Sequence, residues 1–203
     1  MAPINWIDMA GPPPGPLAEF GATWLGWDPE SGQELAHPSV PGLPRPVEAI
    51  TATPRKYGFH GTLKPPFRLA PGRDAEGLHE ALVALAARCA PARADGLALT
   101  PLGRFLALTA TGDNGDIARV AAACVADLDA FRAPPTADEL ARRRKAKLNP
   151  RQDELLLRWG YPYVMDEFRF HMTLTGRLSK PDMAAARQAL EVQLPPLPAP
   201  FVL

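Results

Sequence analysis

Apolar residues recur every three or four positions in several segments of this chain, as on a helix that buries one face. The pattern predicts helices over residues 17–25, 74–89 and 117–131, with Asp74 as the N-cap of the second. A further helix is expected to begin near Pro181, because proline is tolerated in the first helical turn.

Two shorter helices are expected within residues 132–160, where the apolar pattern is weak. Thr136 is followed three positions later by Glu139, and Asn149 is followed in the same way by Gln152. In such a capping box, each side chain satisfies a backbone N–H group at the start of a helix. The segment is therefore expected to be a helical insert.

Alternation of apolar and polar residues predicts strands. Residues 97–100 and 104–111 flank a turn and are expected to pair as a hairpin. Residues 57–69 and 168–175 alternate as well, whereas residues 28–54 are rich in Pro and Gly and predict a long loop.

Each of the strands at 57–69 and 168–175 is followed by a helix, so the layout looks duplicated. It predicts an α+β protein in which residues 1–203 form one domain of two pseudo-symmetric lobes, each a small antiparallel sheet with helices outside. The first lobe would span about residues 1–112, and the second about residues 113–203, including the basic insert at 132–160.

Composition narrows the functional classes. Lys and Arg number 22, as do Asp and Glu, so the chain lacks the basic excess that attracts long nucleic acids. No apolar run is long enough to cross a bilayer and residues 1–8 do not resemble a secretory signal, so we expect a cytoplasmic protein without a membrane partner. The oligomeric state is left open.

The candidate chemistry lies in a five-residue pattern that occurs twice, as Phe59-His60-Gly61-Thr62-Leu63 and Phe170-His171-Met172-Thr173-Leu174. Side chains two positions apart share one face of a strand, so each strand presents a histidine beside a threonine and turns apolar residues the other way. A third match, His37-Pro38-Ser39, lies in the Pro-rich loop and is interpreted as a coincidence.

A pair of histidines suits acid and base chemistry near neutral pH. One neutral imidazole can take a proton from water while a protonated one gives a proton to the leaving oxygen, each transfer contributing on the order of 10²- to 10⁴-fold in rate. A threonine hydroxyl can donate to phosphate oxygens as charge develops there. Such a site needs no metal and no cofactor, and it suits the in-line opening of a cyclic phosphate.

The paired motifs resemble those of the two-histidine (2H) phosphoesterase superfamily, whose hallmark is two His-x-Thr/Ser motifs flanked by apolar residues. The resemblance is closer to a branch encoded with bacterial phosphonate-degradation genes. Residues 57–69, 131–135, 158–163 and 166–178 carry it, and with residues 17–46 it spans most of the chain.

The resemblance implies that His60 and His171 are the acid and the base, in an order that the sequence does not assign, and that Thr62 and Thr173 donate to the phosphate. It implies an active-site cleft between two lobes. It also implies a hydrolase, a metal-independent cyclic phosphodiesterase acting on a small phosphorylated sugar or nucleotide, such as a ribose cyclic phosphate in phosphonate metabolism.

Other functions remain open. Better-known members of the superfamily process RNA 2′,3′-cyclic phosphates or 2′,5′ linkages, and a non-catalytic sensor of a phosphate ligand would keep the same fold. A metal hydrolase is disfavoured because Asp166 and Glu167 have no familiar ligand spacing. Phosphate-binding glycine loops of the P-loop or dinucleotide kind are absent from the sequence.

Further candidates for binding substrate lie near the motifs. Lys64 and Arg169 share the histidine faces and could meet a phosphate or form ion pairs at the rim. Tyr57 lies three positions before His60, so a role in binding requires a bend at Gly58.

The basic run at residues 142–145 is a separate candidate. Arg143 and Arg144 could reach a second phosphate group as part of a mobile flap, or the run could be a solvated helix face. Proteins of the branch also begin with an alternating strand and end with further strands. Residues 5–10 alternate poorly and the chain ends at Leu203, so the outer strands are expected to be missing or replaced.

Overall fold

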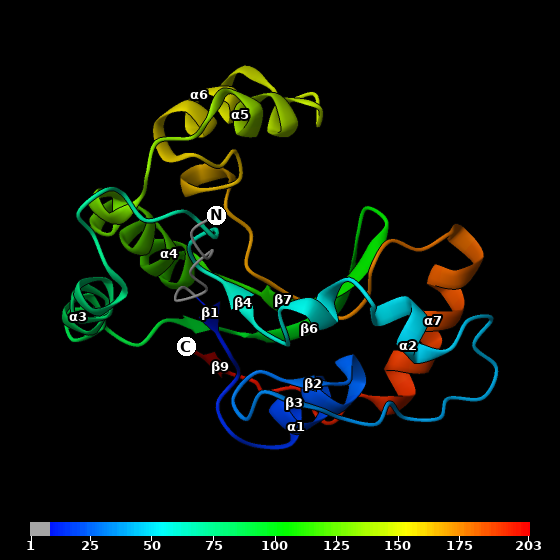
Figure 1. Ribbon diagram of the computed structural model, residues 1–203. Coiled ribbons are helices and arrows are strands. Elements are labelled where there is room, and N and C mark those ends of the chain that lie inside the picture. The colour runs from blue at the N-terminus through cyan, green and yellow to red at the C-terminus, as the bar shows by residue number, and fades with distance from the viewer. Residues whose placement is uncertain (1–8) are drawn as a thin grey trace.

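The computed structural model describes residues 9–203, so the expectation about a secretory signal in residues 1–8 lies outside the described residues. Helices and antiparallel sheets confirm the α+β class (Figure 1). The α-helices are α1 (Pro16–Leu25), α2 (Val47–Thr51), α3 (Ala75–Ala86), α4 (Gly115–Asp127), α5 (Ala137–Arg144), α6 (Pro150–Trp159) and α7 (Lys180–Gln193). The strands are β1 (Met9–Ala10), β2 (Trp27–Asp28), β3 (Gln33–Glu34), β4 (Gly61–Thr62), β5 (Arg93–Ala94), β6 (Gly96–Leu102), β7 (Phe105–Thr111), β8 (His171–Thr173) and β9 (Phe201–Val202). Three 3₁₀ turns complete the chain at Pro54–Lys56, Asp129–Phe131 and Met165–Glu167.

A five-stranded sheet in the order β1-β4-β8-β7-β6 forms the centre of the molecule, and each strand is antiparallel to its neighbour. β6 and β7 form the predicted hairpin. β4 and β8, which hold the two histidine motifs, are direct neighbours. The prediction of two pseudo-symmetric lobes with a sheet each is therefore not confirmed, because both motifs belong to one sheet.

Short strands near both ends of the described chain correct the expectation that outer strands are missing. β1 pairs Met9 with Thr62, and β9 pairs Phe201 with Ala94. The loop expected at 28–54 is also more regular than predicted, because it holds part of the β2–β3 hairpin and helix α2. These elements are too short to leave a periodic pattern in the sequence.

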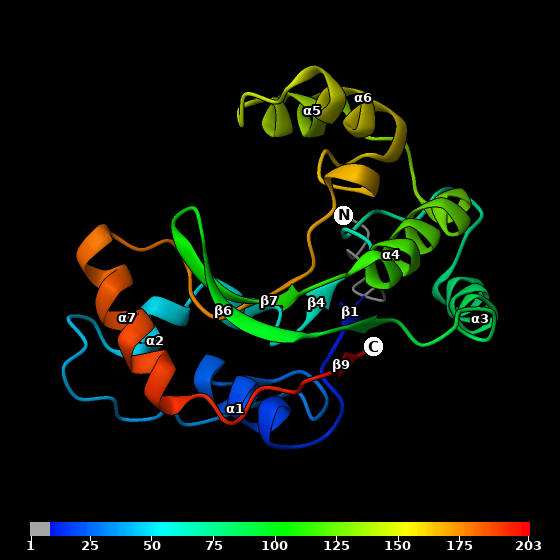
Figure 2. The ribbon, with the colours of Figure 1, turned by 180° about the vertical axis from the view of Figure 1, so that it is seen from behind.

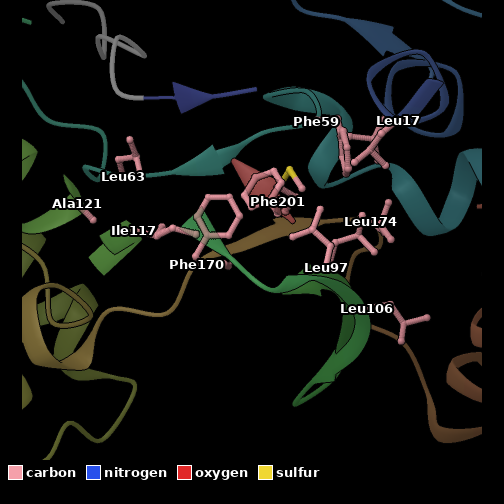
Figure 3. Close-up of a cluster of buried hydrophobic side chains, with 14 of the residues drawn as sticks. Leu17, Phe59, Leu63, Leu97, Leu106, Ile117, Ala121, Phe170, Leu174 and Phe201 are labelled. Carbon is pink, nitrogen blue, oxygen red and sulfur yellow. The ribbon is translucent and has the colours of Figure 1, made fainter. Parts of the chain in front are cut away.

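The apolar face of the motif strands forms the core, as the alternation predicts. Phe59 and Phe170 are each 4% exposed, and the Phe170 ring lies 5.5 Å from that of Phe201 (Figure 3). Helix α1 packs on this face, where the indole N–H of Trp24 donates to the Leu174 carbonyl at 2.9 Å. The opposite face of β4 and β8 is thereby left for the histidines.

The helix starts that the sequence indicates are confirmed. The Asp74 side chain caps α3, and both capping boxes form, Thr136 with Glu139 and Asn149 with Gln152. Between residues 9 and 203, no helix has the length and apolarity needed to cross a membrane.

Helices α5 and α6 stand away from the sheet, on the side opposite α1 (Figures 1 and 2). A small apolar cluster of Val125, Leu155 and Val164 joins α6 to α4. The Arg68 guanidinium also pairs with the Glu139 carboxylate of α5 at 3.1 Å. These contacts hold the insert in place, facing the histidine side of the sheet.

Candidate functional site

The register of β4 and β8 brings the two motifs together. Gly61 pairs with Met172 in an antiparallel ladder. One step to either side, His60 lies across from Thr173 and Thr62 lies across from His171, so the four side chains share one face. The antiparallel pairing relates the two tripeptides by a local two-fold axis through the central pair.

Gly61 allows this close approach. A Cβ atom at this position would overlap the Phe170 ring on the neighbouring strand. The sequence pattern included this glycine, but the contact that requires it joins residues far apart in the chain and is visible only in the structure.

His60 is held at both ring nitrogens. Nδ1 lies 3.2 Å from the Gly58 carbonyl, which can only accept, and Nε2 lies 3.1 Å from the Thr62 hydroxyl. In the neutral ring, Nδ1–H therefore donates to Gly58 and Nε2 accepts from Thr62. His60 is only 7% exposed, and this burial lowers its pKa. The nearby His171 lowers the pKa further, whereas hydrogen bonds to backbone carbonyls oppose the decrease. The neutral ring thus carries its lone pair at Nε2, on the side of Thr62.

His171 uses the same backbone contact in a more open setting. Its Nδ1 donates to the Arg169 carbonyl at 2.9 Å, which is again the residue two positions earlier. The ring lies 5.9 Å from that of Phe105 and is half-buried. Because Nδ1 is engaged, Nε2 is the nitrogen left to face a ligand.

Tyr57 touches both motifs. Gly58 has φ 79°, the left-handed bend that a role for Tyr57 requires, and the Tyr57 ring meets the His60 ring edge-on at 5.3 Å. Burial raises the pKa of Tyr57, while a hydrogen bond with the Thr173 side chain opposes that rise. Tyr57 therefore connects the first histidine to the second threonine.

These residues line a cavity of about 770 Å³ between the sheet and the insert. Its walls also include aromatic, charged and amide side chains from the start of β7 and from residues 143–169, among them Phe105, Arg143, Gln152, Tyr161, Tyr163, Glu167, Phe168 and Arg169. A cavity of this size accommodates a small phosphorylated sugar.

Several of these residues were not predicted from the sequence. Gln152 was recognised only as part of a capping box, yet its side-chain amide also reaches the site. Its Oε1 accepts from the Asn149 backbone N–H at 3.2 Å, and its Nε2 donates to the Glu167 carboxylate at 2.9 Å. The helix cap thus fixes the direction of the amide, and the amide positions Glu167.

The other predicted binding residues divide into two groups. Arg169 and Arg143 line the cavity, and the Arg143 guanidinium stacks on Tyr161 at 4.5 Å. Lys64 does not line the cavity. Strand β4 ends at Thr62, so the alternation of side chains between the two faces does not continue to Lys64.

Lys64 is buried, and its ammonium donates to the Val125 carbonyl at 3.0 Å, outside the lining of the cavity that holds the histidines. Arg144 also lies outside the cavity lining, because its guanidinium is held by Asp153 at 2.7 and 2.9 Å. His37 belongs to another region, with Nδ1 on the Trp24 carbonyl at 3.0 Å. Within residues 9–203, no cluster of three or more His, Cys, Asp or Glu side chains could hold a metal ion.

Comparison with known proteins identifies relatives. A protein named ribose 1,5-bisphosphate phosphokinase PhnN from Janthinobacterium sp. (strain Marseille) is 45% identical over 168 residues, which are 82% of this chain and 37% of the relative. A protein of the same name from Laribacter hongkongensis (strain HLHK9) is 36% identical over 179 residues, covering 87% of this chain and 41% of the relative. The chain thus spans about two fifths of these relatives. No solved structure matches it.

These names correct the expected activity. A phosphokinase transfers a phosphoryl group to its substrate, whereas the sequence motifs led us to expect hydrolysis of a cyclic phosphodiester. The expectation of a cyclic phosphodiesterase is therefore wrong, and the hydrolase class is unsupported. The substrate in the relatives' name is a phosphorylated ribose, the class of small phosphorylated sugar that we expected.

A family model described as "Protein of unknown function (DUF1045)" matches residues 62–203, well over half of the chain. The matched segment holds Thr62, His171 and Thr173, and His60 lies two positions before it. Membership of the wider 2H superfamily stays a prediction. The extent of the match shows that this chain belongs to the DUF1045 family.

Proposed function

We propose that this chain is the part of an enzyme that binds a phosphorylated ribose in the histidine cavity and supplies the acid and base for phosphoryl transfer. The observation that carries the proposal is that two His-Thr pairs on neighbouring strands line the same cavity of about 770 Å³. The name of the relatives, with ribose 1,5-bisphosphate in it, supports the sugar class. The chain's likeness to proteins encoded with phosphonate-degradation genes supports the same setting.

The burial of His60 favours the role of base. Its neutral Nε2 takes the proton from the attacking oxygen of the acceptor while that oxygen forms a bond to phosphorus. The bond from phosphorus to the leaving oxygen of the donor breaks, and His171 gives its proton to that oxygen. Thr62 turns its hydroxyl from His60 to the phosphoryl oxygens, and Thr173 donates from the other strand.

Glu167 fits the sugar better than the phosphate. It is the only carboxylate among the described residues that line the cavity, and a carboxylate repels a phosphate but accepts hydrogen bonds from hydroxyl groups. Gln152 fixes one side of this carboxylate at 2.9 Å. We assign to Glu167 the binding of ribose hydroxyls, which would orient the sugar so that its phosphate meets the histidines.

The proposal is tested by following phosphoryl transfer from ATP to ribose 1,5-bisphosphate by ³¹P NMR. His60→Gln and His171→Gln should each lower the rate by about 10²- to 10⁴-fold, because each removes one proton transfer. The control is His79→Gln, since His79 is exposed on α3 and outside the cavity.

Each outcome has a distinct meaning. A wild-type rate in either histidine variant contradicts the acid and base roles. Tight binding of ribose 1,5-bisphosphate without product in the wild-type chain identifies a ligand-binding protein in place of an enzyme. Absence of binding, measured by calorimetry, contradicts the assignment of the cavity to a phosphorylated ribose.

A further inference from the structure

A second, smaller hollow of about 260 Å³ lies beside the histidine cavity. The walls of both spaces include Pro65, Pro66, Arg143 and Tyr161, so the side chains of Arg143 and Tyr161 lie between the two spaces. We call this second space the basic hollow. A group bound there would be next to a ligand held by the histidines.

The charge of the basic hollow is unusual for a protein whose formal net charge is zero. Among residues 9–203, its walls contain one carboxylate, that of Glu139, and five cationic side chains, which are Lys64, Arg68, Arg132, Arg142 and Arg143. Several like charges that face one small space raise the local potential and favour an anion. The sequence does not reveal this cluster, because its members come from three separate segments.

The neighbouring carboxylates do not neutralise the whole cluster. Glu139 is committed to Arg68, with two hydrogen bonds at 3.2 and 3.1 Å, and this contact lowers the pKa of Glu139 to about 2. Arg132 is paired with Asp129 at 2.7 Å. Arg142 and Arg143 form no ion pair with any described residue, and the stacking of Arg143 on Tyr161 leaves its charge uncompensated.

We propose that the basic hollow binds a second phosphate group, next to the phosphate held by the two histidines. Guanidinium groups recognise phosphate through charge-assisted hydrogen bonds, and Arg142 and Arg143 supply two of them. The second phosphate belongs either to the same bisphosphorylated sugar or to the phosphate chain of a donor such as ATP. This inference rests on the proposed function for the first phosphate, and its own test is separable from that function.

The test compares Arg142→Gln with Lys145→Gln. Arg142 lines only the basic hollow and is exposed, so its replacement should leave the fold intact. Lys145, three positions later, is also an exposed cation and lines neither space. Dissociation constants are measured by calorimetry for ribose 5-phosphate, ribose 1,5-bisphosphate, ATP and inorganic pyrophosphate.

Arg142→Gln should weaken binding of ribose 1,5-bisphosphate about tenfold, consistent with the loss of one charge-assisted hydrogen bond, and leave ribose 5-phosphate within about twofold. Lys145→Gln should change neither. A loss confined to ATP and pyrophosphate would assign the hollow to the donor. Equal behaviour of the two variants toward all four ligands would overturn the proposal. If pyrophosphate binds in an Arg142-dependent way but neither ribose phosphate binds, the basic hollow stands and the proposed function fails.

Discussion

The two His-x-Thr motifs share a backbone contact and differ in their surroundings. In each, Nδ1 is bound to the carbonyl two positions earlier, at 3.2 Å for His60 and 2.9 Å for His171. His60 is buried and its Nε2 is also held by Thr62, whereas His171 is more open to solvent. In the proposed function, this difference in burial favours the buried His60 as the base and leaves the more open His171 as the proton donor.

The largest effect on this arrangement is expected from Gly61→Ala, at the centre of the local two-fold axis. The added methyl group would overlap the Phe170 ring and push β4 from β8. We expect the free energy of unfolding to fall by about 1–3 kcal/mol, measured by urea denaturation, and both histidines to lose their alignment.

Gly11→Ala is the matched control, because a Cβ atom at Gly11 would have no neighbour within 4 Å among residues 9–203. Gly61→Ala with the stability of this control would show that the two strands tolerate a wider spacing. The close approach of the two motifs would then not depend on the glycine.

A smaller effect is expected from Tyr57→Phe, which separates the contributions of the two motifs. The variant keeps the ring contact with His60 but removes the hydroxyl that bonds Thr173. The rate of phosphoryl transfer should fall by about tenfold or less, because one hydrogen bond is worth about 0.5–1.5 kcal/mol. Tyr57→Leu, which also loses the ring contact, should lower the rate further; equal rates in the two variants would show that the ring contact is irrelevant.

The smallest effect is a dependence of stability on pH that comes from His60 alone. Its lowered pKa means that the unfolded chain binds a proton below about pH 6.5 while the folded chain resists it. The contribution of His60 is therefore present above pH 6.5 and is lost as the pH falls toward the folded pKa.

Unfolding free energies at pH 7.5 and 5.5 measure this dependence. The loss between the two pH values should be larger in the wild type than in His60→Gln. The same loss in both proteins would mean that the pKa of His60 is not lowered in the folded state.

The sequence was sufficient for most helices and for the faces of the motif strands. Periodicity located α1, α3 and α4, and the capping boxes located α5 and α6, because these signals are local. Alternation correctly separated Phe59 and Phe170 from the histidines, since burial follows the strand period.

What the sequence could not provide depends on pairing between distant segments. Both motifs lie in one sheet because Gly61 pairs with Met172, and no local signal specifies that register. Lys64 was placed on the histidine face by extending the alternation beyond Thr62, where the strand in fact ends. Glu167 and Tyr161 enter the site only because the insert faces the sheet.

The most direct test of the central claim, that both motifs act on one phosphoryl group, is a titration of ¹⁵N-histidine-labelled protein with ribose 1,5-bisphosphate. The four histidines of the chain include His37 and His79 as internal controls outside the cavity. We expect the Nε2 signals of His60 and His171 to shift together and saturate at one dissociation constant, while the controls stay fixed. A shift of only one of the two rings, or saturation at two different concentrations, would contradict the claim.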